Sequence, residues 1–342
     1  MRICIHMMAG TAMLAAAAFA TAPAHAQTAA GDPNAAPNPF KAVENWAQLP
    51  AGRKWGMVIG VDIDRDGRGV WTFDRCGSNT CEGSNLAPIQ HFDADGKLLA
   101  SFGAGMFVFP HGFYVDRDDN VWASDGRAAG GVGQTVIKFS PKGDVLMTLG
   151  RPGVAGSGPD TFNSPSDVVV APNGDIFVAD GHGGDTNARV VKFDKNGKFI
   201  KAWCQQGSGP GEFNEPHGIA MDSAGRIFVA DRVNSRLQIF DQDGKFLAEW
   251  RQFGRPSGVY IDKNDMIYVA DSQSDDKRNV PFRQGIRIGS AKDGKVIAFI
   301  TDGDPKPNMP EGVAADADGN VYGGFTDKRT LKKFVKDGPL VR

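Results

Sequence analysis

The chain has 342 residues, a net charge of −2 and 41% hydrophobic residues. This composition excludes an intrinsically disordered chain, and it lacks the basic footprint of a nucleic-acid-binding protein. The 44 glycines and 20 prolines exceed the combined share of roughly 12% in average proteins, and they follow no collagen period, so we expect many tight turns.

The first 26 residues carry Arg2, an apolar run and the ending Ala24-His25-Ala26. This layout predicts a secretory signal peptide over 1–26, cleaved after Ala26. A membrane anchor is disfavoured because the apolar stretch is short and rich in small residues. We therefore expect a periplasmic or secreted protein without membrane attachment after cleavage, and a flexible leader over 27–44.

One unit then recurs six times. Each copy has an alternating apolar run, an Asp/Asn/Gly turn and a second alternating run, which is the pattern of a β-hairpin. The copies span 60–74, 114–125, 169–180, 220–231, 260–271 and 314–325. A second hairpin follows each copy, over 89–102, 136–149, 190–203, 237–250, 286–299 and 331–342. Two hairpins make a four-stranded antiparallel blade, so the sequence predicts an all-β fold, a six-bladed β-propeller over 45–342.

Three cysteines remain after removal of the signal peptide. Cys76 and Cys81 flank a short Gly/Ser/Asn loop that one disulfide could close. A metal-binding pair is the less favoured interpretation, because no second Cys/His pair lies nearby in the sequence. We expect Cys204 to be unpaired and buried in a strand.

The repeats open with a Pro-x-Gly or related turn, and its middle residue should line the central channel. In blades 2 to 6 these residues are His111, Ser166, His217, Ser257 and Glu311, and the matching position in blade 1 is Met57. The metal-competent residues His111, His217 and Glu311 fall on alternate blades, about 120° apart around a six-fold axis. Two imidazoles and a carboxylate are the ligands of a catalytic Zn²⁺ site or of a non-haem Fe(II) triad. The alternative is that these histidines only form hydrogen bonds within their turns.

At these residues the sequence resembles a known family. The blades resemble NHL repeats, and residues 55–335 are similar to the peptidyl-α-hydroxyglycine α-amidating lyases through stretches such as FPHGFYVD, PGEFNEPHGIAM, VADRVNSRLQIF and MPEGVAAD. The resemblance implies a six-bladed propeller whose central zinc is held by three histidines. It also implies cleavage of a carbinolamide into an amide and an aldehyde acid.

The resemblance assigns roles to individual residues. His111 and His217 match two zinc ligands of the family, and Glu311 stands where the third histidine is expected. Arg75 matches the arginine that holds the substrate carboxylate, and Arg232 matches a second active-site arginine.

Two positions depart from the family pattern. His182 replaces the catalytic tyrosine, and we interpret it as a base or a further metal ligand. Gly312 replaces an aspartate of the family's structural calcium site, so the resemblance does not carry calcium over.

Three hypotheses of function remain after this comparison. The favoured hypothesis is a metal-dependent lyase or hydrolase, with Zn before Fe or Mn, acting on a small anionic substrate; a gluconolactonase-like hydrolase is one variant. The second is a non-catalytic propeller that binds a protein or glycan partner. The third, redox chemistry with Fe(II) and O₂, rests on the composition of the triad alone. In each case we expect a monomer that does not bind nucleic acid.

Overall fold

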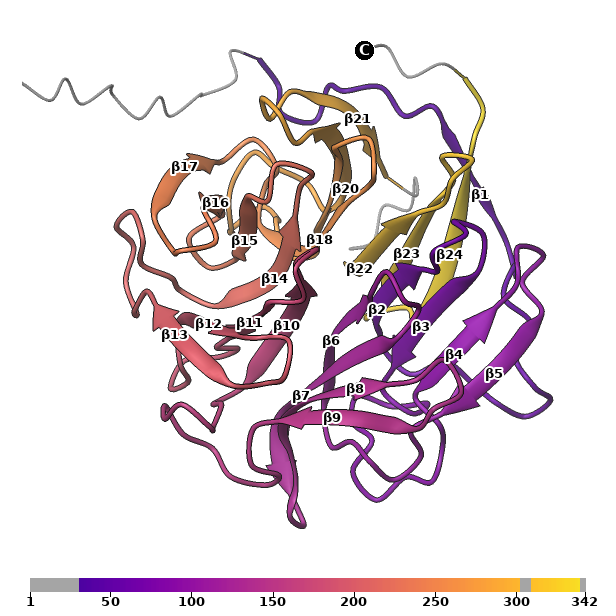
Figure 1. Ribbon diagram of the computed structural model, residues 1–342. Helices are drawn as coiled ribbons and strands as arrows, with labels where there is room; N and C mark the ends of the chain where they lie inside the picture. The colour runs from indigo at the N-terminus through magenta and orange to yellow at the C-terminus, as the bar shows by residue number, and fades with distance from the viewer. Residues whose placement is uncertain (1–30, 302–308, 339–342) are drawn as a thin grey trace, which may run out of the picture.

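The computed structural model describes residues 31–301 and 309–338. Within these ranges the regular elements are 24 strands in six four-stranded antiparallel sheets. The sheets are arranged in a ring (Figure 1), and the predicted six-bladed β-propeller is confirmed. The predicted signal peptide lies outside the described residues.

Each of the first five blades is one continuous stretch of chain, with its strands paired in sequence order. Blade 1 consists of β2 (Val58–Ile63), β3 (Val70–Asp74), β4 (Ile89–Phe92) and β5 (Leu98–Phe102). Blade 2 consists of β6 (Pro110–Val115), β7 (Val121–Ala129), β8 (Val132–Phe139) and β9 (Val145–Leu149). Blade 3 consists of β10 (Pro165–Val170), β11 (Ile176–Asp180), β12 (Arg189–Phe193) and β13 (Phe199–Trp203). Blades 4 and 5 consist of β14 (Pro216–Met221), β15 (Ile227–Asp231), β16 (Arg236–Phe240) and β17 (Phe246–Trp250); and β18 (Pro256–Ile261), β19 (Met266–Asp271), β20 (Gly285–Ser290) and β21 (Val296–Ile300).

The sixth blade differs from the prediction. It contains β22 (Pro310–Ala315), β23 (Val321–Phe325) and β24 (Thr330–Lys336), and its outermost strand is β1 (Phe40–Val43). The predicted hairpin over 331–342 is therefore wrong, because the partner of β24 comes from the other end of the chain. This pairing covers the outer edge of β24 with a strand from the other end of the chain and so closes the ring.

The predicted flexible leader over 27–44 is also corrected, since its described part is held in place. Besides the pairing of β1, Asn34 Oδ1 accepts hydrogen bonds from the Arg283 amide and from Arg287 Nη2, both at 2.9 Å. The Pro37 carbonyl accepts one from the Phe299 amide at 3.0 Å. These contacts attach the segment to blade 5.

The innermost strands β2, β6, β10, β14, β18 and β22 contact one another in sequence around the axis. Their close approach depends on glycine at one repeat position. A Cβ atom on Gly218 would lie 2.4 Å from the Ser257 carbonyl oxygen, and one on Gly258 would lie 2.3 Å from that of Glu311. Both distances are shorter than van der Waals contact, so glycine lets neighbouring blades meet at the axis.

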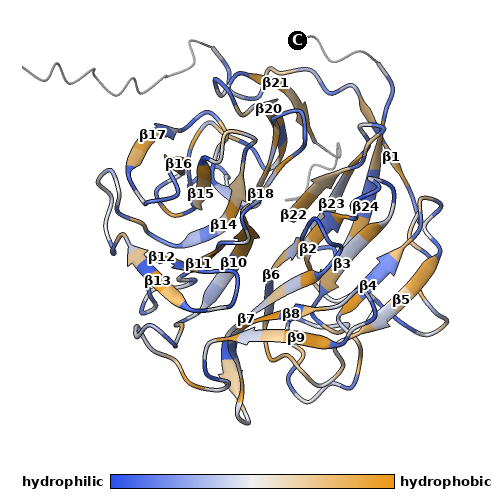
Figure 2. Ribbon diagram, viewed as in Figure 1, coloured by the Kyte–Doolittle hydropathy of each residue, from blue (hydrophilic) through white to orange (hydrophobic). Residues whose placement is uncertain are grey.

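The hydrophobic core lies between the blades. Buried aromatic and β-branched side chains of adjacent sheets interlock, as where Phe73 of β3 contacts Phe107 and Phe113. In the ribbon of Figure 2, apolar residues are concentrated on the strands and polar residues in many of the turns. The recurring aspartates are structural, as Asp125 illustrates by accepting hydrogen bonds from the amides of Val108 and Phe109.

The structure also places the three cysteines. Cys76 and Cys81 form the predicted disulfide. Cys204 is free, but it is only half-buried and follows the end of β13, so the expectation of a strand position was wrong.

Candidate metal centre

The second residue of each inner strand faces the axis and forms a ring. In blades 2 to 6 these residues are His111, Ser166, His217, Ser257 and Glu311, as predicted, and all line the axial cavity. In blade 1 the prediction of Met57 was wrong. Val58 pairs with Asp74 as Pro110 pairs with Asp125, which makes Ile59 the ring residue. An additional residue in the first hairpin shifts the spacing, and the sequence pattern could not reveal it.

Three imidazoles meet at one end of the axis. His111 and His217 come from the ring, and His182 comes from the loop between β11 and β12. One ligand atom from each side chain lies within 4.8 Å of the other two. The ring centroid of His111 lies 4.3 Å from that of His182 and 4.6 Å from that of His217. At these distances the three rings can surround a space the size of a metal ion.

The orientation of His111 is fixed by its second nitrogen. Nδ1 lies 2.7 Å from the Ser166 carbonyl oxygen, which can only accept, so Nδ1 carries the proton and Nε2 keeps its lone pair. Nε2 is buried without a hydrogen-bond partner among the described residues. Metal-bound histidines commonly show this arrangement, in which one nitrogen donates to a carbonyl and the other is left for the ion.

Nε2 of His217 is in a similar position. Oε1 of Glu311 lies 2.9 Å away but without hydrogen-bond alignment, so this nitrogen is also buried and unsatisfied within the described structure. An unpaired buried polar atom costs on the order of 1–3 kcal/mol. Two such atoms beside each other are available to bind a metal ion.

Glu311 does not group with His111 and His217 as the third predicted ligand; His182 takes that place. Glu311 instead faces His217 and lies 3.6 Å from Arg232 Nη1. Burial alone would raise the pKa of Glu311, but His217 and Arg232 outweigh burial and hold that pKa well below its usual range. Glu311 is therefore ionised at neutral pH.

The three imidazoles are neutral. Burial, reinforced by neighbouring histidines and arginines, lowers the pKa of His111 and of His182 well below the usual value, and it lowers the pKa of His217 as well. A neutral imidazole is the form that binds a metal ion.

Arg75 and Arg232 occupy equivalent positions, each one residue beyond the end of the second strand. Blades 1 and 4 lie opposite each other, so the two guanidinium groups flank the same end of the axis from opposite sides. Arg75 is 6% exposed, and burial lowers its pKa to about 10. It donates to the Pro110 carbonyl and to Asn79 Oδ1, and within the described ranges it forms no ion pair.

Arg232 differs from Arg75 because acidic groups already engage it. Its Nε and Nη2 donate to Glu215 Oε2 at 3.0 and 2.9 Å, and Nη2 lies 3.1 Å from His182 Nε2. Arg232 thus links Glu215 and Glu311 to the histidine cluster. The geometry favours Arg75 over Arg232 for binding a substrate anion.

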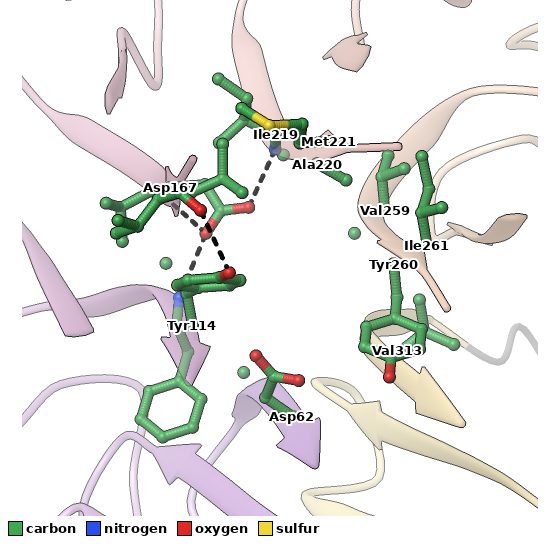
Figure 3. A pocket seen from close by; sticks show the side chains of 18 of the residues that line it. Asp62, Tyr114, Asp167, Ile219, Ala220, Met221, Val259, Tyr260, Ile261 and Val313 are labelled. Atoms are coloured by element: carbon green, nitrogen blue, oxygen red, sulfur yellow. Dashed lines mark hydrogen bonds between the residues drawn. The ribbon is translucent and has the colours of Figure 1, made fainter. Parts of the chain in front are cut away.

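A cavity of about 590 Å³ follows the axis from this ring toward the opposite end of the propeller. Beyond the ring its wall is a layer of apolar residues that includes Phe113, Ile219 and Val259. Asp62 and Asp167 point into it (Figure 3), and both accept hydrogen bonds from amides of neighbouring inner strands. The histidine cluster therefore stands between an arginine-lined end and an acidic, apolar channel.

Sequence reasoning missed Phe109 and Glu215. Both lie two positions before a ring histidine, directly ahead of the repeat proline. This position carries five different residue types in the six blades, so no recurring pattern marked it. The signal that could have identified both residues is their position two residues before a ring histidine.

These observations define the protein as a six-bladed β-propeller with NHL-type repeats and a polar cluster on its axis. Residues 213–240 match the NHL repeat family, and residues 160–226 match a family described as a 6-bladed beta-propeller.

Curated proteins include related chains. Peptidyl-glycine alpha-amidating monooxygenase B of Xenopus laevis is 32% identical over 82% of this chain and 34% of its own length. The probable peptidyl-alpha-hydroxyglycine alpha-amidating lyase of Caenorhabditis elegans is 34% identical over 52% of this chain and 54% of its own. NHL repeat-containing protein 3 of Homo sapiens is 37% identical over 44% of each chain. The protein is thus an NHL propeller related to amidating lyases, and it spans about half or less of these relatives.

Among solved structures, a gluconolactonase from Xanthomonas campestris superposes with a TM-score of 0.57 at 18% identity, over 82% of this chain and 86% of that one. This likeness concerns the fold alone. Within residues 31–301 and 309–338, no helix is long and apolar enough to cross a membrane.

Proposed function

We propose that the protein is a metal-dependent lyase that acts on a small hydroxylated carboxylate at the histidine cluster. The observation that carries the proposal is the pair of buried, unsatisfied Nε2 atoms of His111 and His217 beside His182. A non-catalytic propeller that binds a protein or glycan would have no use for these orphaned nitrogens.

The donor set fits a divalent metal ion. Three neutral imidazoles with room for one further ligand are the donor set of a catalytic zinc site, and His111, His182 and His217 would hold the ion. Fe and Mn stay as alternatives, because the carboxylate of Glu311 lies beside the cluster. When bound, the ion supplies Lewis-acid polarisation of a substrate oxygen.

The remaining residues bind and orient the substrate. Arg75, buried and without an ion pair in the described part of the chain, would bind the substrate carboxylate through a forked hydrogen-bonded pair. Arg232, held by Glu215, can only donate to the His182 Nε2 lone pair 3.1 Å away, and a neutral imidazole has a single lone pair. Binding of the ion by His182 would therefore replace this contact. Phe109 and the apolar loops around it would limit the access of water.

Glu311 is the proton acceptor closest to the cluster. Its ionised carboxylate, 2.9 Å from His217 Nε2, would accept the proton of the substrate hydroxyl. The electron pair of that O–H bond forms a carbonyl, the adjacent C–N bond breaks, and the leaving nitrogen takes up a proton. The products are an amide or amine and an aldehyde acid. This is the type of cleavage that the names of the lyase relatives describe, and N-acyl-α-hydroxyglycines are the first substrates to test.

Metal analysis distinguishes a site formed by the three histidines from the predicted site in which Glu311 takes the place of His182. We expect purified protein to hold about one tightly bound ion, lost in His111→Ala and His182→Ala and retained in Glu311→Gln, which should instead lose turnover. His91→Ala is the matched control, because His91 stacks on Trp71 outside the cluster. Protein that takes up no metal even after supplementation would refute the proposal.

We further propose that the protein is exported, to the periplasm or the medium. The Cys76–Cys81 disulfide supports this, since disulfides persist in oxidising compartments. N-terminal sequencing of protein from fractionated cells should show a mature chain that begins at Gln27. A full-length chain in the reducing compartment would contradict export.

A further inference from the structure

Two guanidinium groups stack on the ring of Phe109. The Cζ atom of Arg75 lies 3.6 Å from the centroid of this ring, and that of Arg127 lies 3.8 Å from it. Cations at these distances are attracted by the face of an aromatic ring. The two guanidinium carbons therefore lie at most about 7 Å apart.

Neither guanidinium group has an acidic partner in the part of the chain that the structure describes. Arg75 donates to the Pro110 carbonyl and to Asn79 Oδ1, both uncharged. Arg127 is exposed, and its guanidinium group stacks on Phe109. Most other arginines that flank this end do have acidic partners, as Arg189 does with Asp180. Two unpaired, preoriented cations at one ring favour an anionic ligand.

Arg127 is placed near the histidine cluster by its contact with Phe109. It lies in the extension of β7 beyond Asp125, and its guanidinium group stacks on Phe109. The Phe109 ring lies 6.2 Å from that of His182. The guanidinium pair therefore stands at the same end of the axis as the candidate metal ligands.

The hairpin that carries Arg127 is tied to the loop that carries His182. Gln134 Oε1 accepts a hydrogen bond from the Ser164 amide at 2.7 Å, and Ser164 Oγ donates to the His182 carbonyl at 3.1 Å. Gln134 Nε2 in turn donates to the Gly126 carbonyl, directly before Arg127. This connection holds Arg127 in a fixed relation to the cluster, as a specificity residue requires.

The geometry points to a second anion-binding position at Arg127, so that the preferred substrate carries two anionic groups, one on Arg75 and one on Arg127. Two guanidinium groups no more than about 7 Å apart can each bind one carboxylate of a short dicarboxylate through charge-assisted hydrogen bonds. A substrate with one carboxylate would leave Arg127 without a counter-ion. The inference rests on the proposed function, because it concerns the substrate of the same site.

Calorimetric titration with simple carboxylates tests this. Succinate and glutarate should bind the metal-loaded protein at least tenfold more tightly than butyrate and pentanoate. Arg127→Ala should abolish that preference by weakening the dicarboxylates alone. Arg127→Lys, which keeps the charge but loses the flat stack, should retain part of it. Arg117→Ala is the matched control, because Arg117 is an exposed arginine in a turn of the same blade at the opposite end of β6.

Each outcome decides the matter. Equal binding of mono- and dicarboxylates by the wild type overturns the inference, and so does a preference that persists in Arg127→Ala, which would mean chelation by the metal. Failure of the proposed function has a different signature: absence of bound metal, or butyrate binding that Arg75→Ala does not weaken. A metal-loaded protein that binds butyrate through Arg75 without preferring succinate refutes only the second position.

Discussion

Asp62 offers a quantitative test of the axial channel. Its side chain is buried on β2, where Oδ1 accepts the Ile63 amide and Oδ2 accepts the Val115 amide of the next blade, both at 2.7 Å. Burial raises its pKa from 3.8 to about 7, and these two hydrogen bonds only partly oppose the rise. Asp167, Tyr114 and Tyr260 face it across the cavity.

The sign of the pH dependence follows from the raised pKa. The folded state binds the Asp62 proton more tightly than the unfolded state does, so this proton adds its full contribution to the unfolding free energy below pH 4. The contribution is lost as the pH rises from about 4 to about 7. A shift from 3.8 to about 7 corresponds to about 4 kcal/mol in total, of which roughly 3 kcal/mol falls between pH 5 and pH 8.

Asp62→Asn removes this titration and leaves one of the two amides without an acceptor. We expect the variant to be less stable than wild type at pH 5 by about 1–3 kcal/mol. Between pH 5 and pH 8 the unfolding free energy of the variant should then rise by roughly 3 kcal/mol relative to that of wild type. Urea unfolding of both proteins at the two pH values measures the difference. The exposed Asp95 serves as control, because Asp95→Asn should change the unfolding free energy by less than about 0.5 kcal/mol at either pH. A stability difference between Asp62→Asn and wild type that does not change with pH would refute the reasoning.

Three further predictions concern the framework of the site. Gly218→Ala should lower the unfolding free energy by roughly 2–4 kcal/mol, since its Cβ would lie 2.4 Å from the Ser257 carbonyl oxygen; an unchanged urea midpoint would show that the inner strands can separate. Phe40→Ala should cost about 3 kcal/mol, because Phe40 is 7% exposed in the closing strand, whereas Lys41→Ala on the exposed side should leave the melting temperature unchanged. Cys81→Ser should cost about 2 kcal/mol of unfolding free energy, and it should weaken carboxylate binding measured by calorimetry if the disulfide loop positions the residues around Arg75.

The sequence was sufficient to predict the fold and most of the axial ring. Alternating apolar residues, Asp/Gly turns and a repeat of constant order depend on short-range chemistry, and each copy reports the same hairpin independently. The same repetition placed His111, His217 and Glu311 at one structural position. The recurring aspartates could be recognised as structural because the same role is needed in every blade.

Other features depend on contacts between distant segments. The closing strand β1 pairs with β24 across almost the whole chain, and no local pattern records a partner so far away. Ile59 replaced Met57 in the ring because one additional residue in the first hairpin alters a register that only strand pairing determines.

The composition of the site was decided in the same way. His182 lies in an irregular loop, so its approach to His111 and His217 depends on how that loop is tied down by Ser164. Once that loop is placed, Glu311 faces His217 and Arg232 instead of completing the ligand set. Residue type and spacing thus determined which side chains reach the axis. Only the packing of three blades against one another decided which nitrogens converge and which arginines are left to bind an anion.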